Sequence, residues 1–197
     1  MPSLPTLELS YNPFSGSLAT ELGLMTGLST LGMSAGGLTG SIPTHVGAMV
    51  GLSSLTLSLN SLLGSLPFEM ANMTSLWSLS LDNNEIGGTL PADLATAARV
   101  SEVRLQNNRF VGTIPSSWGE WSNLRVLQLE NNSVTGAMPL EVCSLRQRHS
   151  FENGALENIY YVVNVLTADC STGTTGNEVS CSQPDCCTAC FSSPTLK

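Results

Sequence analysis

Residues with reactive side chains gather near the end of the chain, where the stretch VSCSQPDCCTACF covers residues 179–191. Thiolates there could bind zinc, carry a redox reaction or form disulfides. The chain has six cysteines, all in its last 55 positions: Cys143, Cys170, Cys181, Cys186, Cys187 and Cys190. Cys187 and Cys190 have a CxxC spacing, but the others supply no clean second pair for a tetrahedral zinc site. The even number favours a local framework of three disulfides, with bound metal as the alternative.

Residue patterns typical of catalysis do not occur in the sequence. His45 and His149 are the two histidines, and neither has a nucleophile motif or a carboxylate at a recognisable spacing. The chain also has no glycine loop that would hold phosphate and no kinase signature. We therefore predict that the chain is not an enzyme and takes no cofactor.

The charge of the chain excludes two classes of partner. The formal net charge is −8, and all seven Lys and Arg residues lie at or beyond Arg99. A protein that binds nucleic acid or an anionic membrane needs a basic surface, so neither is an expected partner. The apolar runs are also much shorter than the roughly 18 residues that a spanning helix requires. The acidic residues are scattered along the sequence, which indicates solubility rather than a site.

An internal repeat with a period of 24 residues occupies most of the chain. Two consecutive units read LSSLTLSLNSLLGSLPFEMANMTS and LWSLSLDNNEIGGTLPADLATAAR. Six units share the frame LxxLxLxxNxLxGxIP, the first two more loosely, over residues 4–27, 28–51, 52–75, 76–99, 100–123 and 124–147. A single unit of this length cannot bury its own apolar face, so the repeat predicts a stack of units around a continuous core.

Each repeated residue type has a structural role. In LxxLxL the residues alternate as in a strand with one buried face, for example Leu79 and Leu81. An Asn follows the strand, where its amide can bond backbone groups of neighbouring turns: Asn12, Asn60, Asn84, Asn108 and Asn132. Gly then allows a tight turn, and Pro fixes the backbone before the outer segment. Gly36 replaces the Asn in the second unit and Ala19 replaces the Pro in the first, so we expect looser structure at that end.

The repeat resembles the plant-type leucine-rich repeat, whose consensus continues IPxxLGxLxxL. The resemblance covers residues 4–147 and implies an α/β-type solenoid. Such a horseshoe has a parallel β-sheet on its concave side and short strands, irregular segments and 3-10 turns on its convex side. Trp118 and Trp121 fall on the two Leu positions of the consensus, so we expect them in the core of the convex side.

We predict two units, the repeats in residues 1–147 and a capping segment in residues 148–197. VVNVLTADC, residues 162–170, has the alternation of one last strand. The stretches VLTADC, VSC and CCTAC, with the closing Phe191, are similar to the cysteine-rich C-terminal caps of leucine-rich repeat proteins of diatoms. This similarity implies a disulfide-rich cap over the last layer of the core.

The variable residues around LxL are expected to point outward from the concave face. They are small and neutral in the first half of the repeats, and larger and charged in the second half. Binding hot spots favour Trp, Tyr and Arg, so we predict a ligand-binding surface formed by Trp77, Asp82, Glu102, Arg104, Gln106, Gln128 and Glu130. The alternative is that these are ordinary solvated strand positions. The Ser and Thr columns also leave ice binding open, with β-propensity as the simpler explanation.

The sequence as a whole favours a leucine-rich repeat binding module that recognises a protein, a peptide or a glycan. A structural, wall-associated or ice-active surface protein and a secreted enzyme inhibitor are the alternatives. The cysteines indicate an oxidising compartment, so an extracellular or cell-surface location is expected. MPSLPTLEL is neither a signal peptide nor a cap, which predicts a truncated N-terminus and a fragment of a receptor-like protein. Two glycosylation sequons occur, at Asn72 and Asn131, and Asn72 is the better acceptor.

Overall fold

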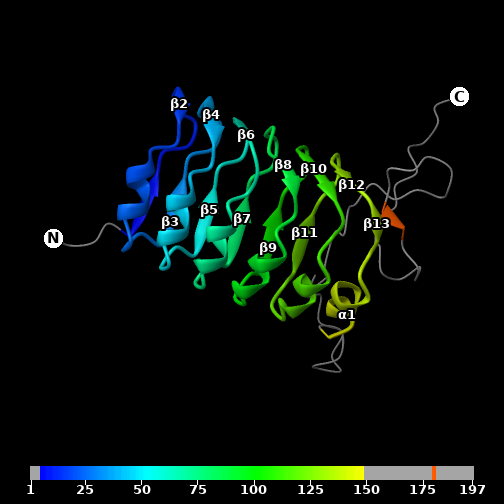
Figure 1. Cartoon of the computed structure of the whole chain (residues 1–197). Coiled ribbons are helices and arrows are strands. Elements are labelled where there is room, and N and C mark those ends of the chain that lie inside the picture. Colours follow the sequence, from blue (N-terminus) through cyan, green and yellow to red (C-terminus); the bar gives the residue numbers. More distant parts are fainter. Residues whose placement is uncertain (1–4, 149–178, 181–197) are drawn as a thin grey trace, which may run out of the picture.

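The computed structural model describes residues 5–148 and 179–180, and it shows a regular stack of repeats (Figure 1). Each repeat contributes one strand to a main sheet, then an outer strand, and then a short helical turn. The predicted leucine-rich repeat solenoid is thereby confirmed. The predicted strand at 162–170, five of the six cysteines, His149 and Phe191 lie outside the described residues.

The main sheet is parallel and follows the chain order. Its strands are β1 (Thr6–Glu8), β3 (Thr30–Gly32), β5 (Ser54–Thr56), β7 (Ser78–Ser80), β9 (Glu102–Arg104) and β11 (Val126–Gln128). We call it the concave sheet. Its strands pair in steps of one repeat, as in Thr6 with Thr30 and Ser78 with Glu102. Equivalent positions of successive repeats therefore form columns across the sheet.

The outer strands form smaller parallel sheets along one flank of the stack. β2 (Gly16–Ser17), β4 (Leu38–Ser41) and β6 (Ser61–Leu63) form one, and β8 (Gly87–Thr89), β10 (Arg109–Gly112) and β12 (Ser133–Val134) form another. Here the pairing is shifted, so that Ser41 lies opposite Leu63 and Thr89 opposite Val111. β13 (Gly136–Ala137) pairs with β14 (Val179–Ser180).

The convex side consists of short helical turns. They are the 3-10 helices η1 (Thr20–Leu24), η2 (Thr44–Ala48), η3 (Phe68–Asn72), η4 (Ala92–Thr96) and η5 (Ser116–Glu120), followed by the α-helix α1 (Leu140–Arg148). A proline precedes four of the 3-10 turns, with φ of −72° at Pro43 and −67° at Pro115. Ala19 adopts the same backbone, with φ of −70°, so the first turn forms without the proline. Within the described residues, no helix has the length and apolarity that a membrane span requires.

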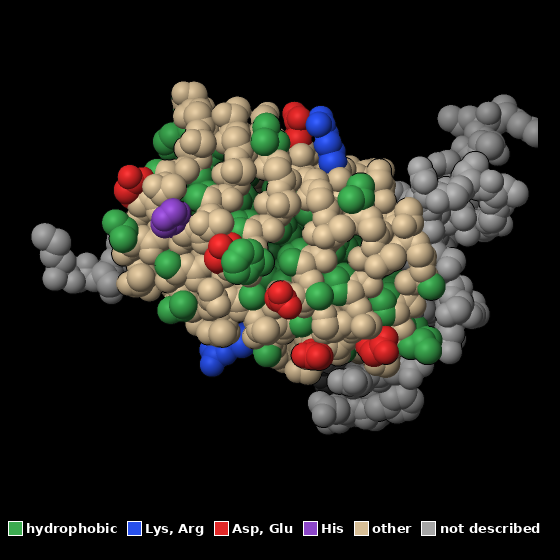
Figure 2. Space-filling model, viewed as in Figure 1, with side chains coloured by type: hydrophobic (Ala, Val, Ile, Leu, Met, Phe, Trp, Pro, Cys, Tyr) green, Lys and Arg blue, Asp and Glu red, His purple; other side chains and the backbone are tan. Residues whose placement is uncertain are grey.

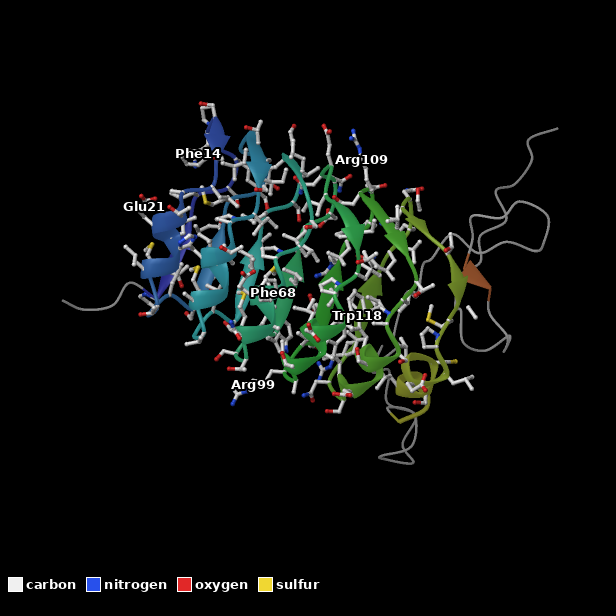
Figure 3. The ribbon with its side chains drawn as sticks, viewed as in Figure 1. Phe14, Glu21, Phe68, Arg99, Arg109 and Trp118 are labelled. Carbon is white, nitrogen blue, oxygen red and sulfur yellow. The ribbon has the colours of Figure 1, made fainter. Side chains whose placement is uncertain are left out.

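The hydrophobic core lies between the concave sheet and the convex turns. Inward residues of the strands, such as Leu55, Leu79 and Leu127, are completely buried. Trp118 (labelled in Figure 3) is also fully buried on the convex side, as predicted. Trp121 is equally buried, and the two ring centroids lie 4.7 Å apart. Burial is lower in the first repeat, where the core is flanked by partly buried apolar residues: Leu7, Leu9, Phe14, Leu22 and Met25.

The regular spacing of the Asn residues along the chain is explained by the hydrogen bonds that their side chains form. The Oδ1 atom of Asn108 accepts from the backbone N–H of Ile86 at 3.0 Å. Its Nδ2 donates to the carbonyls of Leu81 and Leu105, at 2.9 and 3.1 Å. The carbonyl of Leu81 also accepts from Asn84 of its own repeat. The bonds of Asn108 to Ile86 and Leu81 therefore join neighbouring repeats, whereas its bond to Leu105 stays within one. We call this set of side chains the inner asparagine ladder, formed by Asn12, Asn60, Asn84, Asn108 and Asn132.

Candidate functional site

The structure places the seven residues of the predicted binding surface on three neighbouring repeats. Glu102, Arg104 and Gln128 lie on β9 and β11, and Trp77 immediately precedes β7. The remaining members follow the strands, so that Asp82, Gln106 and Glu130 occupy equivalent repeat positions. Six of the seven side chains are partly buried, and Trp77 is the most exposed member, at 46%. We call this surface the concave patch: Trp77, Asp82, Glu102, Arg104, Gln106, Gln128 and Glu130.

Two members of the concave patch neutralise each other. Nη1 of Arg104 lies 2.6 Å from Oε2 of Glu102, and both side chains are more than half-buried. The two residues are separated by one position on the same strand, so both side chains leave the sheet on the same face. A half-buried pair is screened less than an exposed one. Arg104 is therefore engaged within the chain, and a ligand that binds its guanidinium must compete with Glu102.

Asp82 is held in position by neutral donors. Its Oδ1 atom accepts from the hydroxyl of Ser58 at 2.6 Å, and its Oδ2 atom accepts from Nδ2 of Asn83 at 2.7 Å. Neither donor carries a charge, and within the described residues no Lys or Arg forms an ion pair with Asp82. The two neutral donors thus fix the direction of the carboxylate.

A second column of residues, which the sequence did not distinguish, has a left-handed backbone. The φ angles lie between 51° and 59° at Tyr11, Ala35, Leu59, Asn83, Asn107 and Asn131. Nδ2 of Asn107 donates to Oδ1 of Asn83 at 3.0 Å, and Asn131 donates to Asn107 at 2.7 Å. Asn tolerates this conformation better than other residues that carry a Cβ. The doublet NN marks this column in three successive units, but a doublet in the sequence does not reveal a left-handed backbone.

Leu59 tests how much the Asn residues of this column contribute to stability. It adopts the same left-handed backbone, with φ of 58°, but has no side-chain amide. Leu59→Asn is expected to stabilise the fold by about 1 kcal/mol, since Asn adopts the left-handed region at lower cost and can bond Asn83. Leu63→Asn is the matched control, because Leu63 is equally exposed, at 50% against 52%, and has no left-handed backbone. Urea unfolding measures both variants. An equal change in the two free energies of unfolding would contradict the role of the left-handed turn.

The two sequons differ in their surroundings. Asn72 is exposed at the end of η3 on the convex side. Asn131 lies in the left-handed column, and its Nδ2 is already a donor to Asn107. Of the two, Asn72 therefore offers the more accessible amide, and its modification stays a prediction.

Hydroxyl groups on the concave side are unevenly accessible: Thr6 is exposed, Thr30, Ser54 and Thr56 are half-buried, and four serines are buried. Ser34, Ser58, Ser78 and Ser80 are only 7–8% exposed. On the flank, the shifted pairing places Leu63 and Val111 opposite the hydroxyls of Ser41 and Thr89. Neither sheet presents an unbroken exposed array of hydroxyls, so the structure does not favour ice binding.

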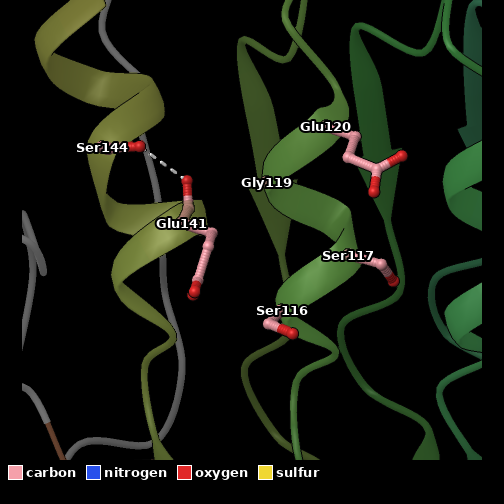
Figure 4. A pocket seen from close by; sticks show the side chains of 6 residues that line it. All are labelled: Ser116, Ser117, Gly119, Glu120, Glu141 and Ser144. Atoms are coloured by element: carbon pink, nitrogen blue, oxygen red, sulfur yellow. Dashed lines mark hydrogen bonds between the residues drawn. The ribbon is translucent and has the colours of Figure 1, made fainter.

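The convex side has a shallow pocket of about 430 Å³ between η5 and α1 (Figure 4). It is lined by Ser116, Ser117, Gly119, Glu120, Glu141 and Ser144. The hydroxyl of Ser144 donates to the backbone carbonyl of Glu141 at 2.8 Å. The lining has three serines and two carboxylates but no histidine, cysteine or lysine. The hydroxyls of Ser117 and Ser144 donate to backbone carbonyls rather than to a carboxylate, so neither is arranged as a nucleophile beside a base.

Other charged groups are dispersed over the described residues. Acidic side chains lie at separate points of the face shown in Figure 2. Arg99 and Arg109 project at opposite edges of the stack in Figure 3, and Arg109 pairs with Glu85 at 2.8 Å. In this part of the chain no three potential metal ligands cluster. Cys143 is disulfide-bonded. The concave patch is therefore the best candidate for a functional site.

Comparison with known proteins agrees with this architecture. The family model for the Leucine Rich Repeat matches residues 75–97 and 123–145. Among solved structures, a TDR receptor is 31% identical with a TM-score of 0.71, over 72% of this chain and 25% of that one. The Arabidopsis receptor kinase HAESA, in complex with the peptide hormone IDA and the co-receptor SERK1, is 28% identical with a TM-score of 0.71, over 74% and 24%. A plant ice-binding protein is 25% identical with a TM-score of 0.63, over 70% and 44%.

The chain thus spans about a quarter of the length of the two receptors. A search of curated protein sequences finds no match. The TM-scores show that the two receptors contain a fold similar to that of the described repeats, and the family model falls on the same frame as the 24-residue period. The described part of this chain is therefore a leucine-rich repeat solenoid of the kind found in the ectodomains of plant receptors.

Proposed function

We propose that this chain is a non-enzymatic binding module that holds an extended peptide or protein segment along the concave patch. The observation that carries the proposal is the exact step of one repeat between β7, β9 and β11. This register brings side chains from distant parts of the sequence into one surface. Long polar side chains and an exposed tryptophan on a rigid sheet are suited to a ligand that lies across several repeats.

The comparison with receptors supports this proposal. HAESA, with a similar fold, is in complex with a peptide hormone and a co-receptor. We propose an extracellular or cell-surface location, which the disulfide at Cys143 supports because disulfides persist in oxidising compartments. We also propose that residues 148–197 cap the repeats. A wall-associated protein and a secreted inhibitor would have different partners, but an inhibitor could use the same surface.

Peptide selection followed by two matched substitutions tests the proposal. The full chain selects from a display library of random peptides of about 12 residues, and fluorescence anisotropy measures the affinity of the selected peptides. Trp77→Ala is expected to weaken binding by about tenfold, since a half-exposed aromatic ring is a common anchor. Phe68→Ala is the control, because Phe68 is an exposed aromatic residue on η3, on the convex side (Figure 3). Failure to select any peptide, or an equal loss in both variants, would overturn the proposal.

A further inference from the structure

The concave sheet has an asymmetric charge. Its outward positions carry four carboxylates, Glu8, Asp82, Glu102 and Glu130, and two guanidiniums, Arg104 and Arg125. Arg104 is paired with Glu102, so it is engaged within the chain. The whole chain has a formal charge of −8. A surface of this sign attracts cations and repels anions during encounter, and it suits a ligand with basic side chains.

The backbone of Asp82 is bonded to Leu59, a residue with an exposed apolar side chain. The hydroxyl of Ser58 holds the carboxylate at 2.6 Å, and the next residue, Leu59, donates its backbone N–H to the carbonyl of Asp82 at 3.0 Å. Leu59 has φ of 58° and is 52% exposed. The left-handed turn thus leaves an apolar side chain at the surface, one residue from the serine that fixes the carboxylate.

Apolar and anionic groups side by side match the shape of a long basic side chain. Lysine and arginine have an aliphatic stem that packs on apolar surface and a charged head that seeks a carboxylate. Asp82 accepts one hydrogen bond at each oxygen, and a carboxylate has about four acceptor positions, so both oxygens can accept another donor. The two neutral donors fix its direction before a ligand arrives, which reduces the ordering that binding requires.

We propose that Asp82 and Leu59 form a subsite for a Lys or Arg side chain of a bound peptide, with the head on the carboxylate and the stem on Leu59. This inference rests on the proposed function and specifies its ligand as a basic peptide. The engaged state of Arg104 supports the same selectivity, because a ligand carboxylate would have to displace Glu102. The seven residues predicted from sequence included Asp82 but not Leu59.

The experiment compares the residues selected by the wild type and by variants. Wild-type chain is expected to enrich Lys or Arg at one position of the displayed peptides. Asp82→Asn is expected to abolish that enrichment and to weaken the best basic peptide by about tenfold, since a charge-assisted bond is lost. Asp93→Asn is the control, because it removes the same charge from exposed η4 on the convex side and is expected to leave selection unchanged.

Leu59→Asn separates the stem contact from damage to the fold. The variant is expected to keep or raise the free energy of unfolding, yet to weaken the basic peptide by a few fold. If peptides are selected without any basic enrichment, or if Asp82→Asn and Asp93→Asn change selection equally, the subsite is overturned and the proposed function stands. If no peptide is selected at all, the proposed function itself fails.

Discussion

Asn108→Ala is expected to lower the free energy of unfolding by about 3 kcal/mol. Asn108 is 8% exposed, and its Oδ1 atom is the acceptor for the backbone N–H of Ile86, a fully buried residue. Alanine leaves that N–H without a partner in the interior, which is costly because no water replaces the lost acceptor. The carbonyls of Leu81 and Leu105 each lose one donor. The first still accepts from Asn84 and the second from Asn132.

Asn107→Ala is the matched control for this change. Asn107 is the preceding residue, and its amide bonds Asn83 and Asn131 at the surface. Its loss is expected to cost about 1 kcal/mol, because water can solvate the exposed partners and alanine must adopt a φ of 57°. Urea unfolding of both variants, followed by circular dichroism, measures the difference. Similar losses of unfolding free energy in the two variants would show that the buried amide of the inner asparagine ladder contributes no more to stability than the surface amide.

The inner asparagine ladder could be predicted because it follows from the repeat alone. A strand that ends and bends leaves backbone donors and acceptors, and an amide has one acceptor and two donors to satisfy them. The second unit shows what the missing amide changes. With Gly36 in place of Asn, the N–H of Phe14 donates to the carbonyl of Asn12 at 2.8 Å instead of to a side chain. The exception occurs where Phe14 is only partly buried, so the cost of the exchange is lower.

The concave columns were also predictable, because a fixed period and parallel strands determine which residues are neighbours. Their chemistry was less predictable. The pairing of Arg104 with Glu102 depends on rotamers, and the direction of Asp82 depends on Ser58, which lies 24 residues earlier in the sequence. The left-handed turn at Leu59 is invisible to hydrophobic periodicity, because a leucine gives no sign of it. For the same reason neither the ion pair of Arg104 nor the exposed position of Leu59 could be predicted from the sequence.

Trp118→Ala is expected to cost about 4 kcal/mol, because it empties a large volume in a completely buried position. The ring also packs against Trp121 at a centroid distance of 4.7 Å and an interplanar angle of 30°. The equivalent position carries Val46, Met70 and Leu94 in the preceding repeats, so Trp118→Leu is expected to cost much less than alanine. Thermal and urea unfolding measure these losses.

Phenylalanine substitutions separate the volume of the two rings from their polar atoms. Nε1 of Trp118 donates to the carbonyl of Pro91 at 3.0 Å, whereas the buried Nε1 of Trp121 has no acceptor among the described residues. Trp118→Phe and Trp121→Phe each remove one indole, so the lost volume is the same in both. Trp118→Phe is expected to cost about 1 kcal/mol more, because a made hydrogen bond disappears, while Trp121→Phe also removes an unsatisfied donor. Equal costs would mean that the bond to Pro91 contributes nothing to stability. The larger cost at Trp118 would instead show that the η5 turn is fixed to the preceding repeat by a polar contact as well as by packing.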